Sequence, residues 1–265
     1  MCADGYAFVD TGAPDTILYA EALPEGMFPL CRPGKPCATR FVSERRATKG
    51  HARAATVSIT ADYCDKTVRD RVRVLERSRT PDPLAFHHGY FGFIGMRTLR
   101  KLRARVLPGR GVSCVRKDEK YAKPHDAIPC SKTPNEGICG WVKFCPPGTR
   151  DVRDPACLKV KALLDSGTMD TEIQDALADT RFPRYGQYRH AAPLRPGRAA
   201  ATTATIALVA DGCATKTNES ALVVSDEGRT RLLDVQALIG RNYMIENRVR
   251  LDPWTNPPSF RCNAY

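Results

Sequence analysis

The chain has 265 residues, of which 42% are hydrophobic, and 41 lysines and arginines outnumber 29 aspartates and glutamates to give a formal net charge of +12. Its length allows one large domain or two halves of about 130 residues. A membrane-spanning helix is not expected, because no apolar run approaches about 18 residues.

The first motif is FVDTGA at residues 8–13. Phe8 and Val9 predict a short buried strand, and Asp10, Thr11 and Gly12 predict a polar loop after it. Taken alone, Asp10 is better explained as an ordinary turn residue near a chain end than as a catalytic residue. The motif therefore gains meaning only if it recurs.

Residues 55–63 alternate in polarity, with Val57, Ile59, Ala61 and Tyr63 on one side, which predicts a half-buried strand. Further along, the apolar-apolar-Gly triplet Phe93-Ile94-Gly95 leads into a helical segment, MRTLRKL.

The segment 96–110 is strongly basic and has apolar residues at helical spacing, namely Leu99, Leu102 and Val106. One interpretation is contact with nucleic acid or another anionic surface. The other is a solvated helix face whose apolar stripe packs inward. The cations concerned are Arg97, Arg100, Lys101, Arg103 and Arg105.

A proline-rich stretch from Lys123 to Pro134 predicts a connection between two halves, residues 1–128 and 129–265. The second half contains LLDSGT at residues 163–168, which repeats the first motif with a buried Leu163-Leu164 strand before Asp165. A rival interpretation of residues 161–177 is helix, glycine turn and helix, as in a helix-turn-helix. The segment 182–186, FPRYG, breaks the recognition helix that such a DNA reader needs.

Strands are expected over 203–210 and 221–225, and a hairpin turn at 226–228 leads to 229–235. Leu238-Ile239-Gly240 then repeats the apolar-apolar-Gly triplet and leads into RNYMIEN. The chain thus reads as two related, mainly β halves with the same order of parts.

These motifs resemble the pepsin-like family of aspartic proteases, especially its cysteine-rich nepenthesin-like branch. The segments 48–59, 107–115 and 238–252 and the closing Cys262 add to the resemblance. It implies a bilobal pepsin-like β-barrel fold with a central cleft and a few short helices, in which Asp10 and Asp165 face each other.

The resemblance also implies a chemistry. Two carboxyl groups that share one proton can activate a water and polarise a peptide carbonyl, without cofactor or metal. Gly12 and Gly167 would allow close backbone approach, and the hydroxyls of Thr11 and Ser166 would brace the two loops. The expected site consists of Asp10 and Asp165, with Thr11, Gly12, Ser166, Gly167 and Thr168 in support and Phe41, Val42 and Ser43 in a flap.

Two alternatives to an endopeptidase remain. Only nine residues precede Asp10, and residues 41–50 contain no flap tyrosine, which fits a weak or inactive pepsin-like binding or inhibitory module. The excess positive charge fits a basic structural or nucleic-acid-contacting subunit in which both motifs are coincidental. His87-His88 suggests no metal site, because no second ligand pair has suitable spacing.

Eleven cysteines without a Cys-x-x-Cys favour disulfides rather than a zinc or thioredoxin-like site. The close pairs Cys31/Cys37 and Cys139/Cys145 suggest small disulfide-closed loops, with Cys2 left unpaired. The sequon at Asn218 agrees with a secreted or vacuolar protein, although the first residues do not form a signal peptide. We expect the protein to be a monomer.

Overall fold

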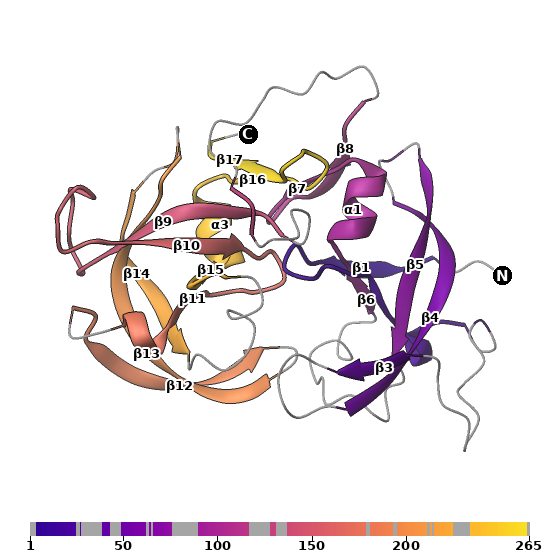
Figure 1. The fold of residues 1–265 in the computed structure, drawn as a ribbon, viewed down its shortest axis with the longest axis horizontal. Helices are drawn as coiled ribbons and strands as arrows, with labels where there is room; N and C mark the ends of the chain where they lie inside the picture. Colours follow the sequence, from indigo (N-terminus) through magenta and orange to yellow (C-terminus); the bar gives the residue numbers. More distant parts are fainter. Residues whose placement is uncertain are drawn as a thin grey trace.

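We describe the fold from a computed structural model of the chain. It describes residues 4–24, 27, 39–42, 49–61, 64, 66–75, 90–116, 128–130, 137–178, 181–192, 195–210, 213, 215–224 and 234–263. Strands dominate and helices are short, and the two halves of the chain form two bodies side by side (Figure 1). The expected mainly β, bilobal fold is thereby confirmed. No helix within the described ranges is long and apolar enough to cross a membrane.

The first half is built on a six-stranded sheet in the order β1-β6-β2-β5-β4-β3. A 3-10 turn, η1, follows β2 at Ala20–Ala22, and α1 follows β6 at Met96–Leu102. The strands are β1 (Tyr6–Val9), β2 (Ile17–Tyr19), β3 (Thr39–Val42), β4 (Lys49–Thr60), β5 (Thr67–Leu75) and β6 (Tyr90–Ile94).

The second half is built on a seven-stranded sheet in the order β12-β13-β14-β11-β15-β10-β9, closed into a barrel by pairing between β13 and β9. Two short helices accompany it, η3 at Asp175–Leu177 and α3 at Arg241–Glu246. The strands are β9 (Cys139–Cys145), β10 (Leu158–Leu164), β11 (Thr171–Gln174), β12 (Arg184–Ala192), β13 (Arg195–Leu208), β14 (Thr215–Val224) and β15 (Ala237–Ile239).

The two large sheets repeat one topology. Strands β1, β6, β2, β5, β4 and β3 of the first sheet correspond in order to β10, β15, β11, β14, β13 and β12 of the second. The pairs β1–β6 and β10–β15 are both parallel, and so are β2–β5 and β11–β14. The internal repeat inferred from the two Asp motifs therefore extends over whole sheets.

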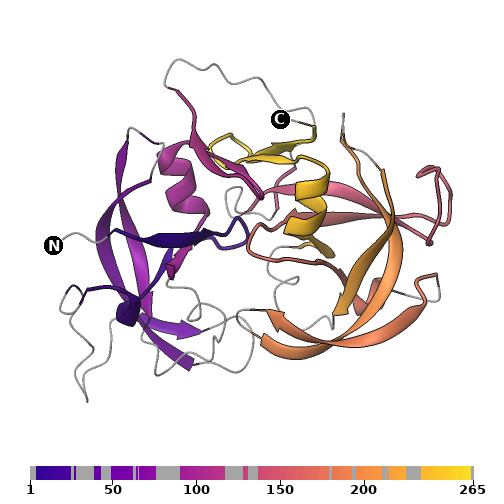
Figure 2. The same cartoon turned by 180° about the vertical axis from the view of Figure 1, so that it is seen from behind.

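A third sheet joins the halves. Its order is β17-β16-β7-β8, with β7 (Ala104–Leu107) and β8 (Gly111–Cys114) from the first half and β16 (Arg250–Asp252) and β17 (Ser259–Arg261) from the second. The link is β16 with β7, where Leu251 pairs with Val106. Figures 1 and 2 both show this sheet above the junction of the two bodies.

One large hydrophobic core runs through the third sheet into both halves. It contains Leu99 of α1, Val106 of β7, Leu251 of β16 and Tyr243 of α3, all buried. Burying each such side chain contributes roughly 1.5–3 kcal/mol. The halves are therefore held together by shared apolar packing as well as by strand pairing.

The structure corrects the predicted cysteine pair Cys139/Cys145. Both residues lie in β9, six positions apart at the ends of one extended strand, which separates their side chains by far more than a disulfide spans. The disulfides among the described residues are Cys64–Cys114, Cys130–Cys139, Cys145–Cys157 and Cys213–Cys262. Cys2, Cys31 and Cys37 lie outside the described residues.

Two helical predictions are wrong. The basic segment does not continue as a helix to Val106, because Arg103 adopts a left-handed conformation (φ 56°) and β7 begins at the next residue. The helix-turn-helix interpretation also fails, since β10 and β11 are strands. Val160, Ala162 and Leu164 are buried together as alternate residues of β10 rather than as a helical stripe.

The expected strands are largely confirmed. The prediction over 55–63 corresponds to β4, which begins earlier and ends at Thr60, and the predictions over 203–210 and 221–225 fall on β13 and β14. Tyr63, the pair His87-His88 and the predicted hairpin at 226–228 lie outside the described residues, as does most of the proline-rich connection.

Candidate functional site

Two equivalent loops meet where the halves touch. Asp10 directly follows β1 and Asp165 directly follows β10. The Asp10 backbone N–H donates to the Ile94 carbonyl of β6 at 3.0 Å, and the Asp165 N–H donates to the Ile239 carbonyl of β15 at 3.0 Å. Each aspartate is thus fixed by the apolar-apolar-Gly strand that runs parallel beside its own.

The residues after each aspartate brace one loop against the other. The Thr11 hydroxyl donates to the Leu164 carbonyl at 2.8 Å, and the Ser166 hydroxyl donates to the Val9 carbonyl at 2.7 Å. The Ser166 N–H donates to the Thr11 hydroxyl at 3.0 Å, and the Thr11 N–H donates to the Ser166 hydroxyl at 3.2 Å. Both side chains are buried, so these hydrogen bonds are shielded from water.

Each glycine lies against the carboxyl group of the opposite loop. A side chain on Gly12 would collide with the Asp165 carboxyl group, and a Cβ on Gly167 would lie 2.6 Å from Cγ of Asp10. The same glycines donate backbone hydrogen bonds to their own aspartates, at 2.8 Å for Asp10 Oδ1 and 2.9 Å for Asp165 Oδ1. Each carboxyl group therefore lies against the glycines of both loops.

The environments of the two aspartates differ in two respects. The Thr168 hydroxyl donates to Asp165 Oδ2 at 3.3 Å, whereas the equivalent position in the first loop is Ala13, which has no hydroxyl. Asp165 is fully buried and Asp10 is partly exposed. The site is therefore symmetric in backbone but not in side chains.

Two threonines that the sequence interpretation missed help to hold these loops. The Gly95 N–H donates to the Thr16 hydroxyl at 3.1 Å, and the Gly240 N–H donates to the Thr171 hydroxyl at 3.4 Å. Both threonines are buried. The signal was present in the sequence, because a threonine stands six residues after each motif aspartate.

The flap candidates Phe41 and Val42 lie in β3, which pairs with β4 in an antiparallel hairpin where Phe41 is opposite Gly50. Ser43 lies outside the described residues. The repeat places the hairpin of β12 and β13 at the corresponding position in the second half. Figure 1 shows both hairpins on the side of the molecule opposite the joining sheet.

Most of the basic residues of the segment 97–105 contact other parts of the protein. Arg97 and Lys101 reach Asp70 at 3.1 and 2.7 Å, and Arg105 reaches Asp252 at 3.3 Å. The guanidinium of Arg103 lies 5.0 Å from the ring centre of Trp254, a cation–π distance. Burial lowers the pKa of Arg100. The apolar side of α1, with Leu99 and Leu102, is buried as the second interpretation expected, and most of the cations have partners within the protein.

Within the described part of the chain, no group of three or more histidine, cysteine, aspartate or glutamate side chains is arranged to hold a metal ion. No protein-family model matches the chain, and no curated protein sequence matches it at a significant level. Among solved structures, the crystal structure of EDGP matches over 95% of this chain and 86% of that chain, with a TM-score of 0.40 and 9% identity. At these values the match identifies neither a family nor an activity.

Proposed function

We propose that the protein is a pepsin-like aspartic endopeptidase, with residues 1–128 and 129–265 as its two lobes. The observation that carries the proposal is the reciprocal arrangement of the two Asp loops, in which Thr11 and Ser166 cross-brace the backbones and each glycine lies against the opposite carboxyl group. Two carboxyl groups in one site can divide the roles of general acid and general base between them.

In this proposal the ionised member of the pair takes a proton from water, and the protonated member donates to the substrate carbonyl. The backbone N–H groups of Gly12 and Gly167 hold the carboxyl groups in place, and the hydroxyl of Thr168 adds a third donor on the side of Asp165. The extended substrate would lie between the lobes, and the β3–β4 hairpin with Phe41, Val42 and Ser43 would cover it.

We assign the protein to the secretory pathway or a vacuole and to a monomeric state as part of the same proposal. Four disulfides among the described residues are typical of oxidising compartments. Asn218, the candidate glycosylation residue, is exposed on β14. The substrate class is unfolded or extended protein chain.

The test is cleavage of an unfolded protein from pH 3 to pH 7, with and without a statine-type inhibitor. We expect inhibitor-sensitive cleavage by the wild type and by the control Asp234→Asn, whose carboxylate is 90% exposed. Asp10→Asn and Asp165→Asn should both be inactive. Cleavage that persists in either dyad variant would refute the proposal.

The binding or inhibitory module stays a second candidate, because residues 41–50 contain no tyrosine to clamp a substrate. It predicts that the statine-type ligand binds with no cleavage at any pH. Cleavage by the wild type that the dyad variants lose would exclude it.

A further inference from the structure

A row of arginines lies on the outer face of the first half. The pattern of β5 alternates strictly, with Val68, Asp70 and Val72 buried and Arg69 and Arg71 exposed. Arg73 is the next residue on the same face of β5, and its side chain is half-buried. Since alternate residues of a strand share one face, about 7 Å apart, the three arginines follow one another along that face of β5.

The neighbouring strand leaves this row uncovered. Directly opposite Arg69, Arg71 and Arg73, strand β4 places Ser58, Thr56 and Ala54. These side chains are small and uncharged, so they neither neutralise the arginines nor hide them. Figure 1 shows β4 and β5 on the side of the first body that faces away from the second.

Helix α1 adds charge beside the part of β5 that precedes its pairing with β2. Lys101 Nζ donates to the Arg69 carbonyl at 3.0 Å, Arg97 donates to the Arg71 carbonyl, and Lys66 Nζ donates to the Lys101 carbonyl at 2.5 Å. Arg97 and Lys101 lie at the edge of the strand, on the side of Asp70, and not in the row itself. We use the name basic face for the row and these neighbouring cations together, namely Lys66, Arg69, Arg71, Arg73, Arg97 and Lys101.

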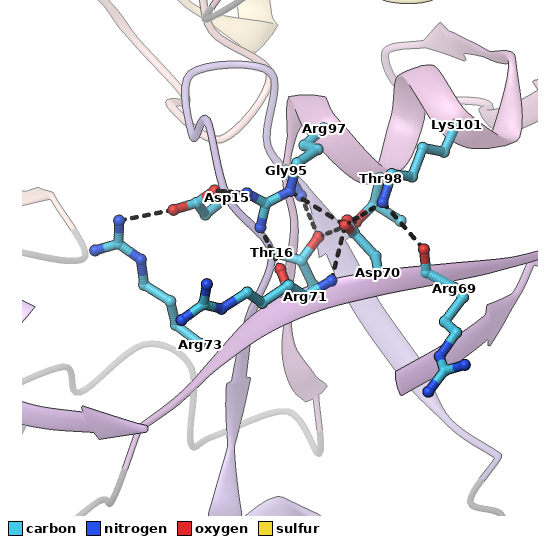
Figure 3. A network of polar contacts seen from close by, with 10 residues as sticks. All are labelled: Asp15, Thr16, Arg69, Asp70, Arg71, Arg73, Gly95, Arg97, Thr98 and Lys101. Atoms are coloured by element: carbon cyan, nitrogen blue, oxygen red, sulfur yellow. Dashed lines mark hydrogen bonds and ion pairs between the residues drawn. The ribbon is translucent and has the colours of Figure 1, made fainter. Parts of the chain in front are cut away.

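Two carboxylates neutralise only part of this basic face. Asp15 binds Arg73 at 2.7 Å and Arg97 at 3.0 Å, and Asp70 binds Arg97 and Lys101. Neither carboxylate forms an ion pair with the side chain of Arg69 or of Arg71. Within the described residues, these two arginines have no acidic partner. Figure 3 shows both guanidinium groups turned away from Asp70.

We propose that this basic face binds an anionic polysaccharide. Regularly spaced cations on an extended strand complement a chain of repeating sulfate or carboxylate groups. A single-stranded nucleic acid would be held by aromatic stacking as well, yet the sequences of β4 and β5 contain no Phe, Tyr or Trp. Disulfides indicate an oxidising compartment, where acidic polysaccharides are the polyanions at hand.

The experiment measures dissociation constants at 0.05–0.3 M salt for heparin, which is sulfated, and for polygalacturonate, which is carboxylated. The test variant is Arg69→Gln/Arg71→Gln. The matched control, Arg150→Gln/Arg153→Gln, removes the same charge from two exposed arginines of the second half. Exposed ion pairs each contribute up to about 1 kcal/mol, so we expect roughly tenfold weaker binding for the test variant at 0.1 M salt. The control should change binding less than about twofold.

Equal weakening in both double variants would overturn the proposal, because it would reduce the effect to net charge. Absence of wild-type binding to both polysaccharides would also overturn it. So would tighter binding to single-stranded RNA of matched charge or to anionic lipid vesicles. Asp165→Asn should bind as the wild type does, and Arg69→Gln/Arg71→Gln should cleave a small peptide as the wild type does. This separates the basic face from the dyad.

Discussion

The two halves share a backbone plan but differ in what they bury behind their Asp loops. Arg73 pairs with Ile17 in the first half, and Leu222 pairs with Glu172 at the equivalent place in the second. Asp70 of β5 and Glu219 of β14 each stand three residues before these positions, so they correspond to each other. One carboxyl group therefore lies at the same place in each half. What surrounds it is different.

In the first half the carboxyl group is enclosed by donors (Figure 3). Asp70 accepts from Thr98 Oγ1 at 2.5 Å, Lys101 Nζ at 2.7 Å, the Arg71 N–H at 2.9 Å and Arg97 Nε at 3.1 Å. Burial by itself would raise the pKa of Asp70, but the hydrogen bonds from Lys101 and Thr98 and the charges of Arg97 and Lys101 outweigh it. The pKa of Asp70 is therefore lowered.

In the second half the equivalent helix positions carry no cation. Asn242, Tyr243 and Glu246 stand where the first half has Arg97, Thr98 and Lys101. Burial, aided by the charge of Asp170 and opposed by Lys216, raises the pKa of Glu219. The equivalent carboxyl groups are thus met by an ion cluster in one half and, in the other, by helix positions that carry a buried tyrosine and no cation.

The largest expected effect concerns the dyad, where the halves should be equivalent. Asp10→Asn and Asp165→Asn should each lower the cleavage rate by at least about 100-fold, because neither carboxyl group can replace the other. The double variant should be no worse than either single one. Initial rates on a peptide at the optimal pH measure this. A single variant that keeps more than a tenth of the activity would break the equivalence.

The next effect concerns the cross-brace. Thr11→Val and Ser166→Ala should each destabilise the protein by about 2–3 kcal/mol, since each leaves buried backbone groups without a partner. Because each hydroxyl accepts from the backbone N–H of the other residue and the two hydroxyl oxygens lie 3.3 Å apart, the double variant should cost clearly less than the sum. Urea unfolding of the four proteins completes the cycle. Strict additivity would mean that the hydroxyls act independently.

Asp70→Asn should destabilise the protein at neutral pH by about 2 kcal/mol, because Lys101 and Arg97 lose their buried partner but can still reach water. Since the folded pKa of Asp70 is lowered, its stabilisation is fully present above roughly pH 4, the unfolded value, and is lost as the pH falls through the folded pKa. Melting curves of wild type and variant should therefore converge in strong acid.

Glu219→Gln provides the contrast. A raised folded pKa means that the ionised carboxylate costs stability above that pKa, and that the cost disappears below roughly pH 4. At neutral pH the free energy of unfolding of the variant should equal that of the wild type or exceed it by less than about 1 kcal/mol. This difference in stability should vanish in acid. A loss of stability comparable to that of Asp70→Asn would show that the second half also depends on its carboxylate.

Another small effect belongs to Tyr243, whose hydroxyl accepts from the Leu208 N–H at 3.2 Å. Burial raises the pKa of Tyr243 to about 12. Tyr243→Phe removes that acceptor and should cost about 1 kcal/mol. Because the tyrosine stays neutral, the cost should be the same from pH 5 to pH 9, as measured by denaturant unfolding. A pH-dependent cost in this range would contradict the buried, neutral hydroxyl.

The internal repeat could be inferred from the sequence because short local motifs mark it. An apolar pair precedes Asp10 and Asp165, and an apolar-apolar-Gly triplet precedes α1 and α3. Strand β10 was harder, since Leu163 and Leu164 are also good helix formers. Only pairing with both β9 and β15 decides in favour of a strand.

Other features depend on distant partners and could not be read locally. The pairing of Cys145 with Cys157 follows from the path of the loop after β9, which spacing alone does not specify. The ion pairs of the basic segment 97–105 with Asp70 and Asp252 could not be predicted, because these acids lie far away in the sequence. The six-residue interval to Thr16 and Thr171 was visible but had no meaning until the loops were seen in three dimensions.

The joining sheet has a consequence for synthesis. Strand β7 pairs with β16, which leaves the ribosome only after nearly all of the second half has been made. Until then the hairpin of β7 and β8 carries an open edge, and an open edge invites pairing with another chain. The first half can therefore complete its folding only after the end of the chain has been synthesised. Until then it can associate wrongly with a neighbouring nascent chain, and slow translation would favour this error.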